Sequence, residues 1–145
     1  MGARYSVNKV GTALSTTADS LTITAPATRA LKIWEIRPYG QGTTSAANEI
    51  LISRSTGGVT PVAVTPTPQA SGSAAALFTA ASSWTTQPTI GVTLRRIGVN
   101  SNGAYSPLVF MPGNEIEIPP SGVLSIRSAV GTGSVTLDVL VEEVG

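Results

Sequence analysis

Histidine and cysteine are both absent from this chain of 145 residues. Histidine is the usual acid/base group near neutral pH and a common metal ligand, and cysteine supplies reactive thiolates and soft metal ligands. Their absence excludes a Ser-His-Asp triad, a Cys-His pair and a zinc site with nitrogen or sulfur ligands. We therefore expect a protein that binds or holds something, with no enzyme activity, no metal and no cofactor.

Charge is also scarce, since only 12% of the residues are charged and the net charge is +1. No basic stripe follows the chain, so we expect no nucleic acid partner. No run of about 18 apolar residues occurs, so we expect no membrane span. A sparsely charged surface gives weak protection against self-association, and it fits a chain whose surface is covered by other subunits.

Strand-forming residues are abundant, because 43 residues are Val, Ile or Thr, whose branched side chains suit a pleated surface. Short runs with alternating apolar residues are separated by turn residues. The expected strands cover 21–25, 31–37, 50–52, 62–64, 90–94, 108–110, 116–118, 124–126 and 135–141, with Pro38 ending the second of them. This pattern predicts an all-β fold, a jelly-roll-like antiparallel β-sandwich or barrel of about eight strands with a Pro-rich loop.

The domain organisation is a single β-sandwich domain over residues 19–145, preceded by residues 1–18 as an N-terminal arm or a first strand. Residues 1–18 contain few apolar groups, so the arm hypothesis predicts a mobile segment that crosses a neighbouring molecule. In that case, deleting residues 1–14 would leave folding nearly unchanged. Residues 73–83 are rich in Ala, which favours a short helix, but a loop or an edge strand fits this stretch as well.

Two pairs of carboxylates are candidates for chemistry. Glu115 and Glu117 lie on the same side of an expected strand, at a separation that would suit an inverting glycosidase. We interpret them as the solvent face opposite the flanking isoleucines, and Glu142 and Glu143 as solvated charges. We therefore expect no catalytic residue.

Candidate interface residues come from aromatic side chains, arginines and the N-terminal segment. Trp34 follows Ile33, so the two point to opposite faces of one strand, and Trp34 lies either in the core or at a subunit contact. Arg95 and Arg96 also face opposite sides, and arginine suits interfaces because its planar fork pairs with carboxylates. The candidates for a subunit or capsid interface are Arg4, Tyr5, Val7, Trp34, Arg37, Tyr39, Trp84, Arg95 and Arg96.

Several turn-and-strand motifs over residues 20–145 carry a resemblance to a known family. The chain resembles the jelly-roll capsid decoration (cement) proteins of tailed bacteriophages, and a thermophilic long-tailed phage is one source that fits. The motifs are the Pro-rich stretch 59–68 with the small residues up to 83, then 110–113, 115–122, 124–127 and 139–143. An acidic turn associated with the Pro-rich stretch is replaced here by 69–72, Gln-Ala-Ser-Gly.

The resemblance implies a structural virion protein. Such a protein is made in the host cytoplasm, forms a homotrimer, binds the major capsid protein on the outer surface of the head and stabilises the shell. The alternative is a trimeric receptor-binding, tail-tip or lectin-like module, which would gather exposed aromatic and polar groups in one pocket. A third hypothesis is a hydrolase that uses carboxylates alone.

Overall fold

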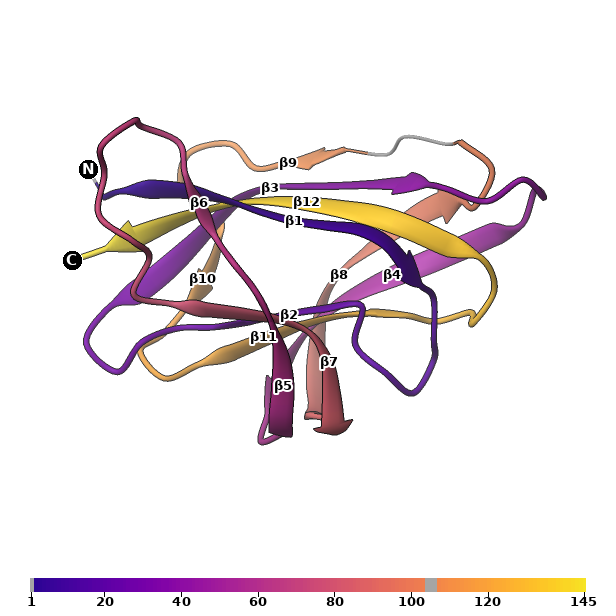
Figure 1. Cartoon of the computed structure of the whole chain (residues 1–145), viewed down its shortest axis with the longest axis horizontal. Coiled ribbons are helices and arrows are strands. Elements are labelled where there is room, and N and C mark those ends of the chain that lie inside the picture. The colour runs from indigo at the N-terminus through magenta and orange to yellow at the C-terminus, as the bar shows by residue number, and fades with distance from the viewer. Residues whose placement is uncertain (1, 104–106) are drawn as a thin grey trace.

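The computed structural model describes residues 2–103 and 107–145 and has two six-stranded antiparallel sheets packed as a β-sandwich (Figure 1). The twelve strands are β1 (Arg4–Ala13), β2 (Leu21–Thr24), β3 (Ala30–Gly40), β4 (Ala47–Thr56), β5 (Val59–Val64), β6 (Thr67–Pro68), β7 (Thr79–Thr86), β8 (Thr89–Asn100), β9 (Leu108–Val109), β10 (Ile116–Ile118), β11 (Val123–Ser128) and β12 (Ser134–Val144). The described residues form no helix. The all-β sandwich prediction is confirmed, with more strands than the expected eight.

The first sheet has the strand order β10-β3-β12-β1-β6, with β9 also paired to β3, and the second has the order β5-β7-β2-β11-β4-β8. The core lies between the sheets. Alternation places apolar side chains there, as on β12, where Val135, Leu137, Val139 and Val141 are completely buried. Burial of these aliphatic groups is the main stabilising contribution to the fold.

The N-terminal segment is a strand of the first sheet, so for residues 4–13 the first-strand alternative holds and the arm alternative does not. β1 pairs along its length with β12 and at one end with β6. Its apolar groups are few, but Tyr5 and Val7 point into the core and are buried. A short strand needs only alternate apolar residues to join a sheet, because its backbone supplies the remaining contacts.

The strand expected over 62–64 is confirmed as part of β5, but the rest of the Pro-rich stretch is not the expected loop, because residues 59–68 contain two strands. β5 is an edge strand paired with β7, and β6 pairs with β1 in the other sheet. Pro61 is tolerated because an edge strand leaves some N–H groups unpaired. Pro38 does not end β3 either. Pro38 pairs with Leu137 of β12, and no described strand pairs with it on the other side of β3. A missing N–H on that other side breaks no ladder.

The Ala-rich stretch 73–83 is a loop followed by a strand, so the helix alternative is wrong. Hydrogen bonds from outside the segment hold the loop. The Tyr5 hydroxyl donates to the Ala74 carbonyl at 3.2 Å, and the Glu143 carboxylate accepts the N–H groups of Leu77 at 2.5 Å and Phe78 at 3.2 Å. These contacts, and the pairing of β7 with β2 and β5, outweigh the weak helix preference of alanine.

Candidate functional site

The chain ends meet in a corner of the first sheet, which we call the terminal corner, made of Gly2, Arg4, Trp34 and Glu142. The Glu142 carboxylate accepts the Gly2 N–H at 2.8 Å and the Trp34 indole Nε1–H at 2.6 Å. The Arg4 guanidinium lies 4.8 Å from the centroid of the Trp34 ring, and its Nε is 3.5 Å from Glu142 Oε2. Trp34 is half-buried and directed toward this cluster.

Glu142 is ionised in this corner. Burial, the largest single influence, raises its pKa, but the hydrogen bonds from Gly2 and Trp34 and the charges of Arg4 and Lys32 together outweigh it. The pKa of Glu142 therefore lies below its ordinary value, as expected for a carboxylate that accepts several hydrogen bonds.

Glu143, the next residue, is equally enclosed. Its carboxylate caps the loop before β7, as described above, and lies 3.7 Å from the Arg29 guanidinium. Only 6% of Glu142 and 2% of Glu143 are exposed, so the expectation that both are solvated is wrong. The reason is topological, because β12 is a central strand flanked by β1 and β3.

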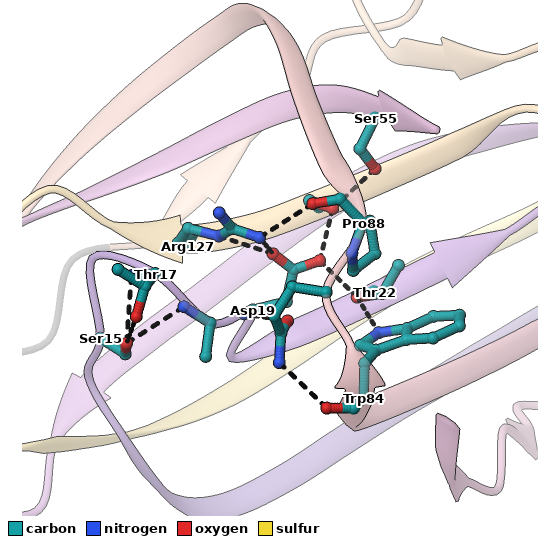
Figure 2. A network of polar contacts seen from close by, with 11 residues as sticks. Ser15, Thr17, Asp19, Thr22, Ser55, Trp84, Pro88 and Arg127 are labelled. Atoms are coloured by element: carbon teal, nitrogen blue, oxygen red, sulfur yellow. Dashed lines mark hydrogen bonds and ion pairs between the residues drawn. The ribbon is translucent and has the colours of Figure 1, made fainter. Parts of the chain in front are cut away.

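A second polar cluster lies on the outer side of the second sheet, centred on Asp19 (Figure 2). The Asp19 carboxylate accepts the hydroxyl protons of Thr22 at 2.7 Å and Ser125 at 2.5 Å. Its other oxygen accepts Arg127 Nε at 2.8 Å, and Arg127 Nη2 lies 2.6 Å away. This buried ion pair joins the segment before β2 to β11.

The end of β7 and its connection to β8 fold over this cluster, as Figure 2 shows for Trp84 and Pro88. The Trp84 indole donates to Thr22 Oγ1 at 2.9 Å, the Pro88 carbonyl accepts Arg127 Nη2 at 3.2 Å, and Gln87 Oε1 accepts the Asp19 N–H at 3.0 Å. Ser and Thr hydroxyls extend the layer across the sheet, as in the Ser55–Ser125 pair at 2.6 Å.

The Asp19 cluster is closed to solvent, since the Asp19 side chain has no exposed surface. Every oxygen of the carboxylate has a partner, so the cluster stabilises the fold and presents no group to a substrate. Sequence reasoning missed it because its members come from separate strands and no local pattern marks Asp19.

The predicted interface residues do not form one surface. Tyr5 and Val7 are buried in the core, Arg4 and Trp34 belong to the terminal corner, and Trp84 covers the Asp19 cluster. The remaining four lie apart on β3 and β8: Arg37, Tyr39, Arg95 and Arg96.

Two shallow hollows contain several charged residues. One of about 180 Å³ on the first sheet is lined by Ser6, Glu35, Arg37, Gln69, Asp138 and Leu140. The other, of about 260 Å³, is lined by Arg54, Leu94, Arg95, Glu115, Ile116 and Glu117. Glu115 accepts the Gly113 N–H at 2.8 Å and Glu117 is exposed, while Ile116 and Ile118 are buried. This agrees with the interpretation of this strand as half solvent-facing.

A region whose own residues carry no charge adjoins the Asp19 cluster on one side and Arg54 on another. From Ser55 to Leu94 the sequence contains no charged residue. This stretch includes β5, β7 and the start of β8, which run together away from the body of the sandwich in Figure 1. We call residues 56–64 and 84–92 the neutral tip. The missing charges were visible in the sequence, but only the fold shows that they leave one projecting surface.

Comparison of the chain with protein-family models, with curated proteins and with solved structures finds no match. Within residues 2–103 and 107–145, no group of three or more acidic side chains is placed to hold a metal ion. In the same residues, no helix long and apolar enough to cross a bilayer is found.

Proposed function

We propose that this chain is a structural virion protein that binds the outside of a phage capsid as a homotrimer and stabilises the shell. In this proposal it has a jelly-roll fold, no enzyme activity, and the major capsid protein as its partner. The phage assignment rests on the sequence resemblance, and the strand order and surface support it as follows.

The strand order supports the jelly-roll part of the proposal. Four antiparallel pairs are nested along the chain: β1 with β12, β2 with β11, β3 with β10, and β4 with β8. A long hairpin folded over itself gives this arrangement, with alternate strands in opposite sheets. The strands β5, β6 and β7 are then an insertion between β4 and β8.

The distribution of apolar and aromatic groups supports the proposed capsid binding over a receptor-binding module. Both indole N–H groups donate to partners within the chain, Trp34 to Glu142 and Trp84 to Thr22. The exposed large apolar side chains lie instead over several elements, with Val59 and Val62 together on β5: Val10, Val59, Val62, Leu77, Val92, Val109, Met111 and Val130. A receptor-binding module would gather such groups in one pocket, whereas a cement protein needs contacts spread over several faces.

The direct test is addition of the purified protein to capsids that lack it. We expect saturable binding, seen by electron microscopy as three-fold density on the outer surface, and a higher temperature of capsid disruption. Capsids with no added density and unchanged heat resistance would show that the proposal is wrong.

One observation favours the lectin-like alternative, namely the polar hollow on the first sheet. Carboxylate, guanidinium and amide groups from Glu35, Arg37, Gln69 and Asp138 line it, and such groups bind sugar hydroxyls. A glycan array distinguishes the two functions, because binding that is lost with Asp138→Ala would favour the lectin-like module.

A further inference from the structure

Four strands stand at the ends of the two sheet orders, and they differ in how they are protected. β8 carries Arg95 and Arg96, β10 contains Glu117 and follows Glu115, and β6 has only two residues. β5 has six residues and no charge within it or beside it in the sequence. Proteins usually protect an open edge strand with charged residues, short length, bulges or proline, and β5 has Pro61 and a register shift between Val62 and Ala63 but no charge.

β5 is also apolar where it is exposed. Five of its six residues are exposed, and Val59 and Val62 are 55% and 58% exposed. Its contact with β7 is mainly backbone pairing, and a strand pair without a covered apolar face is marginally stable in water. Valine at these positions gains nothing from the subunit alone, so the composition fits a surface that another chain covers.

Rotational symmetry favours a further copy of this chain as the one that covers β5. In a ring of identical subunits, a side chain beside the axis meets its own copies, and a charge there meets identical charges. Like charges at close range are destabilising. Of the other described edge strands, β8 and β10 carry Arg or Glu, and β6 and β9 have only two residues each, so the neutral tip holds the longest edge strand without charge and is the side suited to lie beside an axis.

We propose that the neutral tip is the contact between copies of this chain, with Val59 and Val62 packed beside the three-fold axis of the homotrimer. This inference rests on the proposed function, because it assigns the subunit contact of the proposed trimer. It commits to further copies of the chain as the occupants of this surface.

The test introduces charge at two valines that are similarly exposed, Val62 in the tip at 58% and Val10 on β1 at 63%. Light scattering during size-exclusion chromatography gives the mass across a dilution series. We expect Val62→Lys to raise the concentration for half-dissociation at least about tenfold, which for a trimer is about a hundredfold in the dissociation constant, or about 2.7 kcal/mol per trimer, and Val10→Lys to leave it unchanged.

The outcomes separate the two proposals. A trimeric wild type whose Val62→Lys variant remains fully trimeric, or whose Val10→Lys variant dissociates equally, overturns the tip contact and leaves the trimer standing. A wild type that is monomeric at every concentration overturns the proposed trimer itself. Circular dichroism checks that each variant is folded.

Cysteine cross-linking provides a second measurement that does not depend on weakening the assembly. The chain has no cysteine, so Val62→Cys introduces the only thiol. We expect a short bifunctional maleimide to give a species of twice the subunit mass with Val62→Cys and none with Val10→Cys. Equal or absent cross-linking in both variants would overturn the tip contact.

Discussion

The terminal corner and the neutral tip differ in which residues they bury, because the corner encloses charged side chains and the tip exposes apolar ones. Glu142 in the corner and Glu143 beside it are almost completely buried, and each has several partners within the chain. In the tip, Val59 and Val62 are more than half exposed, and no charge lies nearby in the sequence. From polarity alone, the two glutamates would be expected on the surface and the two valines in the core.

The difference shows that position in the sheet order decides exposure. A central strand such as β12 has neighbours on both sides, so even its charged residues are enclosed and must be paired. An edge strand that leaves the sandwich has nothing to cover its valines. The corner therefore contributes stability to the subunit, whereas the exposed valines of the tip contribute little to it.

Removing the strand that closes the corner should have the largest effect. Deletion of residues 2–10 removes Tyr5 and Val7 from the core and leaves β12 without its partner β1. We expect loss of cooperative thermal unfolding, followed by circular dichroism. For comparison, Val7→Ala should cost roughly 2 kcal/mol and Val10→Ala almost nothing. An unchanged melting temperature in the deletion variant would restore the arm hypothesis.

The next largest effect is expected at the Asp19 cluster, where the neutral tip joins the sandwich. Asp19→Asn leaves the Arg127 guanidinium without its buried counter-charge, and breaking a buried pair in this way costs about 3–5 kcal/mol. Urea denaturation should show this loss. The exposed control Glu117→Gln should change the free energy of unfolding by less than about 0.5 kcal/mol. Similar values for both variants would mean that the Asp19 pair contributes little.

Glu142→Gln should have an intermediate effect that depends on pH. At neutral pH, loss of the charged hydrogen bonds should cost about 1.5–3 kcal/mol. Because folding lowers the pKa of Glu142, its contribution is complete above the ordinary value of 4.5 and is lost as the pH falls toward the folded-state pKa. The difference in melting temperature between wild type and variant should therefore narrow below about pH 4.5. A difference that stays constant down to pH 2 would contradict the assignment.

The smallest of these effects is expected at Gly57 in the tip, where φ is +77°, and the adjacent Gly58, with φ of +96°, provides a matched comparison. Gly57→Ala meets no atom within 4 Å and should cost about 1–2 kcal/mol for the left-handed backbone. Gly58→Ala would also place its Cβ 2.7 Å from Trp84 Cε3, so it should cost about 1 kcal/mol more. Thermal melts measure the costs, and a shift in tryptophan emission should occur only for Gly58→Ala.

Sequence reasoning predicted the strands well where alternation was strong and failed where context decided. The patterns around Ile23, Ile52, Ile118 and Val139 all lie in strands. The strand expected over 62–64 lies in β5, whereas the Pro-rich residues of β6 and the Ala-rich residues 79–83 of β7 carry preferences against strand that pairing with distant segments overrides. Residues 1–18 looked too poor in apolar groups, although a strand inside a sheet needs few.

The polar clusters were not predictable in the same way. Glu142 is enclosed because β1 and β3 flank β12, and Asp19 is enclosed because Trp84 and Pro88 fold over it. Each enclosure joins residues far apart in the chain, and alternation within one strand contains no information on such pairs. The run without charge was readable from the sequence, but its projection from the sandwich was not.

The pairing of the first strand with the last has a consequence for synthesis. β1 lies between β12 and the two-residue β6 in the first sheet, and Arg4 pairs with Glu142, which is far along the chain. Such non-local contacts slow folding, because the intervening loop must close before they form. On the ribosome, most of β1 must wait unpaired until β12 has emerged, because β6 pairs only with Tyr5 and Ser6. Translation of nearly the entire chain therefore precedes completion of the first sheet.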